Sequence, residues 1–169
     1  KPGDILTAKN GKTIEVENTD AEGRLTLADA LCYACELNVD EIIDIATLTG
    51  ACMVAFGTQC SGLLGTDKEM LDKIEQIGLE QGEKFWQLPM FEEYFDNIRS
   101  NVADMKNTGG RYGGASVAGI FLKEFVKEGQ KWAHLDVAGT AFLDKPQKEL
   151  IKGSTGIGVR TLTNYILAI

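Results

Sequence analysis

The stretch Glu41-Ile42-Ile43-Asp44-Ile45-Ala46-Thr47 decides the fold class of this chain. It is an almost continuous apolar run, which is typical of a strand buried on both faces of a sheet. Another strand is predicted at Trp132–Val137, far along the chain, and Gly62–Gly65 predicts a shorter one. Strands of this kind belong to a central sheet that helices cover.

Segments in which apolar residues recur at helical spacing separate these strands. Thr26–Asn38, Lys68–Gly78 and Ser116–Glu128 have this spacing and are predicted helices. Glu92–Arg99 and the chain from Gly158 to Ile169 are also expected to be helical, and two short strands, Ile5–Ala8 and Thr13–Glu17, are expected at the start. Strands that alternate with helices predict an α/β layered domain.

The composition places the chain among single soluble domains. Its 169 residues are enough to bury a core, and 44% hydrophobic and 25% charged residues are ordinary values. The net charge of −8, without any basic run, argues against nucleic acid as a partner. No apolar stretch has membrane-spanning length, and no basic-then-apolar start resembles a signal peptide.

The four cysteines do not form a recognisable metal or disulfide pattern. Cys32 and Cys35 have C-x-x-C spacing but lie inside a predicted helix, whereas Cys52 and Cys60 stand apart. The chain has one histidine, His134, so no zinc motif can be completed by paired histidines. We expect buried free thiols, which indicates an intracellular, reducing compartment.

The segment Asn18-Thr19-Asp20-Ala21-Glu22-Gly23-Arg24-Leu25 carries the clearest candidate chemistry. If it is extended or forms a turn, the side chains of Asp20, Glu22 and Arg24 project to one side as two carboxylates and one cation. Carboxylate oxygens suit a divalent metal, and a guanidinium suits an anion beside it. In a helix, residues two apart diverge by about 200°, so this interpretation needs a non-helical backbone.

A helix cap is the alternative for the same residues. Thr19-x-x-Glu22 matches a capping box, and carboxylates are common at helix starts. Local chemistry alone favours the cap. However, a cap does not need Arg24, and a cation in the first turn opposes the helix dipole. The metal or anion interpretation therefore stays open.

Two predicted strands end in small or polar residues, Thr47–Gly50 and Ala138–Thr140. Ligands of α/β sheets bind beyond the carboxyl ends of strands, and small residues let a ligand approach the backbone. An ordinary transition from strand to loop explains either segment taken alone. The glycine-rich loop Gly109–Gly114 lacks the spacing of a phosphate-binding motif, so tight turns and close helix packing explain it better than a nucleotide site.

Three polar residues occur inside apolar strands. His134 has no partner at metal-ligand spacing and is expected to be a core histidine with satisfied hydrogen bonds. Asp44 and Asp136 are costly to bury alone, so we expect them to be hydrogen-bonded structural acids.

The octapeptide from Asn18 to Leu25 resembles the signature of the leucyl (cytosol) aminopeptidase family of metallopeptidases. Further segments resemble that family's catalytic domain in the same order: Lys1–Asp4, Gly11–Thr13, Leu27–Leu31, Asp44–Ala51, Val102–Asn107, Trp132–Gly139 and Gly153–Gly156. The resemblance covers essentially the whole chain. It implies an α/β layered domain with a mixed central sheet flanked by helices.

The resemblance also implies a function: removal of N-terminal residues, often leucine, from peptides or amino-acid amides by a water that two metal ions activate. By motif position, Asp20 resembles a ligand of one metal and Glu22 the carboxylate that bridges both. Arg24 resembles the catalytic arginine that holds a bicarbonate ion. The family implies zinc or manganese, with magnesium as a further option, a cytoplasmic location and a hexamer. Residues that resemble substrate contacts are Thr47, Leu48, Gly50, Ala138 and Ala141.

The chain departs from the family pattern upstream of the signature. The remaining metal ligands of the family, a lysine and two aspartates, and a second, catalytic lysine precede the signature. Lys1–Glu17 does not resemble that segment, and Lys9 and Lys12 are not substitutes. Residues 1–169 are therefore expected to be the C-terminal portion of the catalytic domain, with an incomplete site and little activity alone. A non-catalytic domain that keeps the fold for assembly or binding is the alternative.

Overall fold

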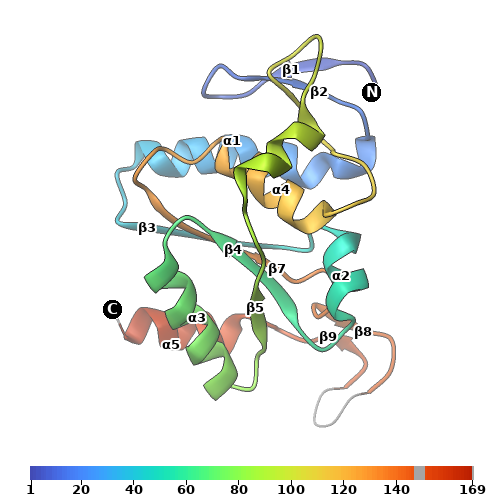
Figure 1. Cartoon of the computed structure of the whole chain (residues 1–169). Coiled ribbons are helices and arrows are strands. Elements are labelled where there is room, and N and C mark those ends of the chain that lie inside the picture. The colour runs from blue at the N-terminus through green and yellow to red at the C-terminus, as the bar shows by residue number, and fades with distance from the viewer. Residues whose placement is uncertain (147–150, 169) are drawn as a thin grey trace.

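The computed structural model describes residues 1–146 and 151–168, arranged as strands and helices that alternate along the chain (Figure 1). The strands are β1 (Ile5–Thr7), β2 (Thr13–Glu15), β3 (Glu41–Ala46), β4 (Ser61–Gly65), β5 (Phe85–Gln87), β6 (Met105–Lys106), β7 (Lys131–Asp136), β8 (Phe142–Leu143) and β9 (Gly153–Ser154). The α-helices are α1 (Glu22–Glu36), α2 (Gly50–Phe56), α3 (Lys68–Glu80), α4 (Gly114–Lys123) and α5 (Val159–Leu167), and η1 (Thr19–Ala21) and η2 (Glu92–Ile98) are 3₁₀ helices.

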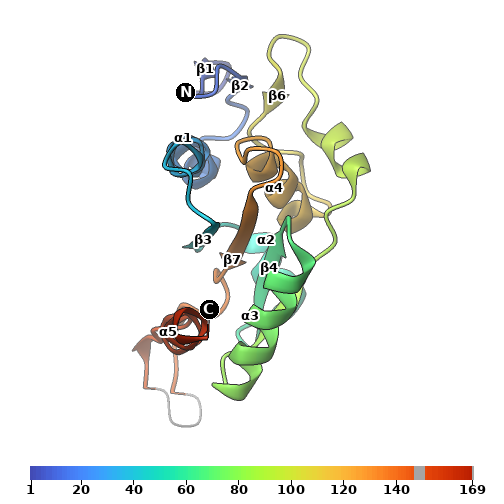
Figure 2. The same ribbon diagram turned by 90° about the vertical axis from the view of Figure 1, so that its left-hand side faces the viewer.

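The central sheet is mixed and has the order β3-β7-β4-β5. Strand β7 runs parallel to β3 and antiparallel to β4, and β4 runs parallel to β5. Helices α1 and α4 lie on one side of this sheet, and α3 and α5 lie on the other (Figure 2). The predicted layered α/β fold with a mixed, helix-flanked sheet is confirmed.

Strand β7 separates the two cores because alternate side chains of a strand point to opposite faces. Trp132 belongs to the core that α1 and α4 share, whereas Ala133 and Leu135 belong to the core with α3 and α5. Every residue of β7 except Lys131 is buried. The predicted strand at Trp132–Val137 is thus confirmed as β7, and it is buried on both faces.

The prediction of a strand buried on both faces, made for Glu41–Thr47, is wrong for β3, whose residues are mostly half-buried and whose Ile45 is 41% exposed. Among the described strands, β3 pairs with β7 alone and so lies at the edge of the sheet. Its apolar run resembles that of β7, and composition cannot separate an edge strand from a central one.

Several boundaries differ from those predicted. Helix α1 begins at Glu22 rather than Thr26, and α4 ends at Lys123 rather than Glu128. Strands β5, β6, β8 and β9 were not predicted because runs of two or three residues show no period. The expected C-terminal helix is α5, which ends at Leu167, and Ile169 lies outside the described residues.

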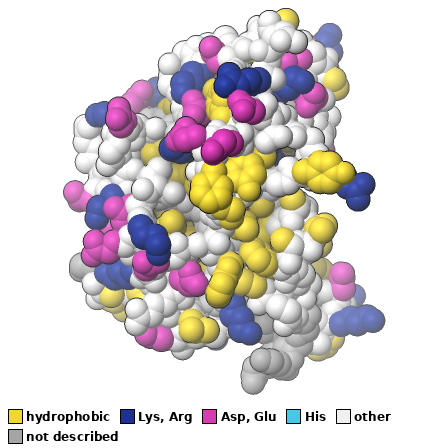
Figure 3. Space-filling view, viewed as in Figure 1, with side chains coloured by type: hydrophobic (Ala, Val, Ile, Leu, Met, Phe, Trp, Pro, Cys, Tyr) yellow, Lys and Arg dark blue, Asp and Glu magenta, His cyan; other side chains and the backbone are white. Residues whose placement is uncertain are grey.

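One face of the molecule carries a run of exposed hydrophobic side chains (Figure 3). Strand β5 and helix η2 cross this face in Figure 1, and their neighbourhood includes the exposed side chains of Trp86 and Phe91. Phe91 stacks on Tyr94 with ring centroids 6.3 Å apart. Among the described residues, no helix is both long and apolar enough to cross a membrane.

Candidate functional site

The segment that carries the candidate acids is a helical turn. Thr19–Ala21 is the 3₁₀ helix η1, and α1 follows it directly from Glu22. The expected row of side chains on an extended or turning segment is not formed, because Glu22 and Arg24 lie two residues apart in α1. The Thr19 capping box is wrong as well, because Asn18 caps η1 by accepting from the Asp20 amide, and the N-cap of α1, Ala21, makes no side-chain cap.

The carboxylates of Asp20 and Glu22 are exposed and unengaged. Within the described part of the chain, neither makes a hydrogen bond or ion pair, and no three His, Cys, Asp or Glu side chains lie close enough to hold a metal. Two free carboxylates suit a hard divalent cation in kind. The described residues thus fit part of a metal site, and further ligands are needed to complete it.

Arg24 is buried beside these acids, with only 8% of its surface exposed. Its Nη1 donates to the carbonyl of Asn107 at 2.8 Å, and its guanidinium lies 6.0 Å from the ring centroid of Phe121. Burial lowers the Arg24 pKa to about 10, and Asp136 opposes this shift. The side chain remains a cation at neutral pH, and its buried Nε has no partner among the described residues.

Asp20 and Arg24 line an open pocket of about 670 Å³. Leu48 and Gly50, from the connection between β3 and α2, line the same pocket, as do residues 108–117. The structure therefore brings together four of the residues that the sequence singled out. Four others do not line it: Glu22, Thr47, Ala138 and Ala141.

Asp136 organises the pocket wall from the end of β7. Its buried carboxylate accepts hydrogen bonds from the amides of Leu48 (3.1 Å), Thr49 (3.3 Å) and Ala138 (3.2 Å) and from Thr49 Oγ1 (2.7 Å). Thr49 Oγ1 in turn accepts from the Cys52 amide at the start of α2. The expectation of a hydrogen-bonded structural acid is confirmed, and this acid joins the ends of β3 and β7.

Asp44 is also hydrogen-bonded, as expected. It accepts from Trp132 Nε1 at 2.7 Å and contacts His134 Nδ1 at 2.5 Å, in a register that places Asp44 opposite His134. His134 is a core histidine, as predicted, but its buried Nε2 has no partner in the described residues. It does not join the pocket.

The glycine-rich loop forms turns and close contacts. Gly110 and Gly113 have positive φ values of 81° and 63°. A Cβ on Gly109 would lie 2.7 Å from Val117 Cγ1, and one on Gly114 would lie 2.9 Å from Ala51. Turn geometry and helix packing therefore explain these glycines, as the sequence indicated.

The expected free thiols are present: Cys32, Cys35 and Cys52 are buried and Cys60 is half-buried. Sequence reasoning missed two functional candidates, Thr49 and Asn107. Thr49 was recognisable as an N-cap residue before an apolar segment. Asn107 carries no local signal, because its partners lie about 90 residues away.

Comparisons with known proteins agree with this geometry. Residues 1–163 match the model of the cytosol aminopeptidase family, catalytic domain. Probable cytosol aminopeptidases of Gloeobacter violaceus and a Cyanothece species are each 58% identical to the chain over 99% and 98% of its length, which is 33% and 34% of theirs. A tomato leucine aminopeptidase mutant superposes with a TM-score of 0.94 at 51% identity, covering all of this chain and 32% of that one. The chain thus spans about a third of its curated relatives. It belongs to the cytosol aminopeptidase family.

Proposed function

We propose that this chain forms part of the catalytic domain of a metal-dependent aminopeptidase, with Asp20 and Glu22 as metal ligands. One observation carries the proposal: a free carboxylate, Asp20, and a buried cation, Arg24, line one pocket at the end of the central sheet. Family membership supplies the reaction class. Paired divalent ions in such sites polarise the scissile carbonyl and supply an activated water.

Arg24 is the proposed catalytic cation. Its guanidinium is held by the Asn107 carbonyl, so its position is set before any ligand arrives. An anion near it would restore electrostatic balance in a buried site, which favours a small oxyanion such as bicarbonate. Arg24 is the residue that would hold such a bicarbonate, which would supply general-base chemistry at this point of the site.

The substrate is proposed to be a peptide or amino-acid amide with a free N-terminus. Leu48 and Gly50 line the pocket, and the connection that includes them and Thr47 is tied to Asp136. The Ala138 amide also donates to the Asp136 carboxylate. Ala138 and Ala141, which follow β7, are therefore proposed to shape the subsite for the substrate's side chain. Small residues there leave room for the first side chain of the substrate.

The metal set is proposed to be zinc or manganese, with magnesium as a further option. Two described carboxylates cannot hold two ions, so the remaining ligands are proposed to come from other parts of the protein. Residues 1–169 are accordingly proposed to be the C-terminal portion of the catalytic domain. Alone, the 169-residue chain is expected to be inactive or nearly so.

The protein is further proposed to be a cytoplasmic hexamer. The names of the relatives, probable cytosol aminopeptidases, support the location. The exposed hydrophobic run along β5 and η2 supports assembly, because monomers rarely expose contiguous apolar patches (Figure 3).

The test measures hydrolysis of leucine p-nitroanilide by the full-length protein that contains this chain, after chelation and re-addition of Mn²⁺ or Zn²⁺. We expect hydrolysis that requires metal and falls on the order of 100-fold or more in Glu22→Ala. Glu36→Ala on the same helix, whose side chain pairs with Lys9, is the matched control and should be neutral.

Two outcomes would count against the proposal. Hydrolysis that survives chelation would exclude the metal mechanism. Metal binding without hydrolysis of any aminoacyl anilide or peptide would favour the alternative, a non-catalytic domain that serves assembly or binding.

A further inference from the structure

Asn107 is a fully buried side chain, 0% exposed, directly after β6. Its Oδ1 accepts from the amides of Glu17 at 2.9 Å and Asn18 at 3.2 Å. Its Nδ2 donates to the carbonyls of Asn18 at 2.7 Å and Ala21 at 3.4 Å. The amide group therefore uses both acceptor sites and both donors on one short stretch of backbone.

The peptide groups of Asn107 reach the same region. Its N–H donates to the Glu15 carbonyl at 3.0 Å, and its carbonyl accepts from Arg24 Nη1 at 2.8 Å. One residue thus contacts the strand that enters the turn, the backbone of the turn and the buried cation that follows it.

The turn needs such an external support. Within the turn, the Asn18 side chain caps η1, but Ala21, the N-cap of α1, provides no side-chain cap. The exposed carboxylates of Asp20 and Glu22 make no contacts among the described residues that would hold the turn in place. The contacts of Asn107 on both sides of Asp20 supply that support.

We propose that Asn107 is a positioning residue that fixes Asp20 and Glu22 relative to Arg24. This inference rests on the proposed function, because it assigns Asn107 to the same metal ligands. Ligands carried on a short turn must be held within about 0.5 Å by surrounding hydrogen bonds to bind metal well. Loss of the Asn107 amide is therefore expected to weaken metal binding before it unfolds the protein.

An isosteric substitution separates the chemistry of this side chain from its size. Asn107→Asp keeps acceptors for the Glu17 and Asn18 amides but places a second oxygen against the carbonyls of Asn18 and Ala21. Two hydrogen bonds become two repulsive contacts without a change in volume. Asn107→Ala removes all four side-chain bonds, and Asn107→Asp carries the test where that variant fails to fold.

The matched control is Ile74→Ala. Ile74 is a residue of α3 that is 0% exposed in the core with α3 and α5, and it does not line the pocket. Its truncation creates a cavity and lowers stability without touching the turn. If Asn107 has a merely structural role, Asn107→Asp and Ile74→Ala should both lower the thermal midpoint and leave the metal affinity unchanged.

The experiment uses the full-length protein and three measurements. Calorimetric titration with Mn²⁺ is expected to show affinity about 10- to 100-fold weaker in Asn107→Asp than in wild type or Ile74→Ala. Amide exchange of the metal-free protein should be faster at Glu17 and Asn18 in Asn107→Ala, which removes the acceptor of both amides. Hydrolysis should recover toward the wild-type kcat at saturating Mn²⁺, because the ligands themselves remain.

The outcomes are distinguishable. Wild-type Mn²⁺ affinity in Asn107→Asp, with the thermal midpoint lowered as in Ile74→Ala, would overturn this inference alone. A wild-type protein that neither binds Mn²⁺ nor hydrolyses the anilide would overturn the proposed function and this inference with it.

Discussion

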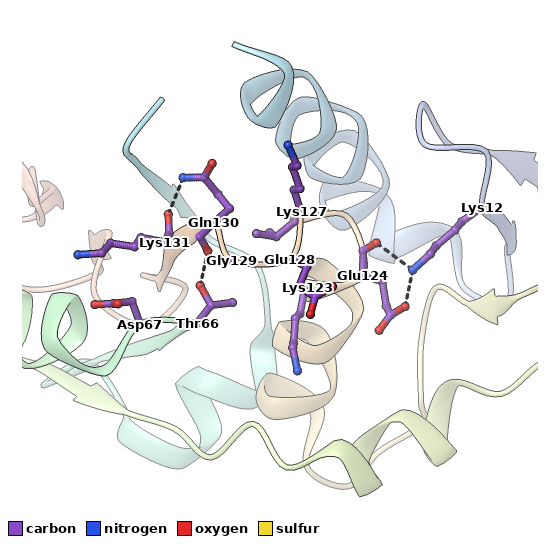
Figure 4. Close-up of a pocket in the computed structure, with 11 residues that line it drawn as sticks. Lys12, Thr66, Asp67, Lys123, Glu124, Lys127, Glu128, Gly129, Gln130 and Lys131 are labelled. Atoms are coloured by element: carbon purple, nitrogen blue, oxygen red, sulfur yellow. Dashed lines mark hydrogen bonds and ion pairs between the residues drawn. The ribbon is translucent and has the colours of Figure 1, made fainter. Parts of the chain in front are cut away.

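The two ends of strand β7 handle charge in opposite ways. At the carboxyl end, one carboxylate, that of Asp136, is 1% exposed and accepts hydrogen bonds from two loops. At the amino end, an open cleft of about 540 Å³ is lined by four lysines, Lys12, Lys123, Lys127 and Lys131 (Figure 4). The amino end therefore carries more charged side chains, whereas the carboxyl end holds the buried carboxylate on which hydrogen bonds converge.

The lysines at the amino end are exposed or half-buried, and most have acidic neighbours. Lys12 contacts the Glu124 carboxylate at 2.6 Å, and Lys123 contacts Glu92 at 2.6 Å. Such solvated pairs contribute little stability and do not fix the surrounding backbone. Burial and convergence of hydrogen bonds, rather than the number of charges, therefore distinguish the candidate site.

The largest effect is expected from Asp136→Ala. It leaves the amides of Leu48 and Ala138 and the Thr49 hydroxyl without their acceptor, and it removes the nearby charge that compensates Arg24. Removing one partner from a buried polar network costs about 3 to 5 kcal/mol of unfolding free energy. Urea denaturation measures this loss.

The control for this change lies at the other end of β7. Lys131 is exposed, and its Nζ lies 4.0 Å from Glu41. Lys131→Ala is expected to change the unfolding free energy by less than about 0.5 kcal/mol. Similar losses of unfolding free energy in Asp136→Ala and Lys131→Ala would mean that the two ends of β7 do not differ in their contribution to stability.

The fold was predictable where the sequence has a period. The apolar runs of β3 and β7 and the spacing in α1, α3 and α4 predicted the layers correctly. The edge position of β3 was not predictable, because it depends on which strands pair with it. Strands of two or three residues, such as β6, exist through their partners alone.

The candidate site was predictable only in its chemistry. The spacing of Asp20, Glu22 and Arg24 selected a segment of which Asp20 and Arg24 line the pocket, although its backbone is helical rather than extended. Asn107 and Asp136 act on segments more than 80 residues away, so no local pattern reveals their partners. Family resemblance identified their segments but not these contacts.

A smaller effect is expected from pH at the carboxyl end. Burial raises the pKa of the Cys52 thiol to about 12, and the charge of Asp136 adds to the shift. The unfolded thiol ionises near pH 9, so its contribution to stability is complete below pH 9 and is lost as pH rises toward 12. Between pH 8 and 10, wild type should lose about 1 to 2 kcal/mol more than Cys52→Ala.

Denaturation of both proteins at the two pH values measures this difference. Cys32, Cys60 and Tyr165 also have pKa values that burial raises, and all three are present in both proteins. The difference between wild type and Cys52→Ala in how the unfolding free energy changes with pH therefore reports on Cys52. Parallel slopes would mean that the thiol is accessible to solvent in the folded state.

The smallest effect is expected from Lys12→Met at the amino end. Its ammonium contacts both the carboxylate and the carbonyl of Glu124, yet its side chain is 39% exposed. Water and salt compete for such a pair, so the loss should stay below about 1 kcal/mol and shrink further in about 0.5 M NaCl. Lys127→Met is the matched control, because the Lys127 ammonium has no partner among the described residues. If the loss of unfolding free energy did not shrink in salt, the Lys12 ion pair would be shielded from solvent as Asp136 is. The amino end would then contain a second buried polar network.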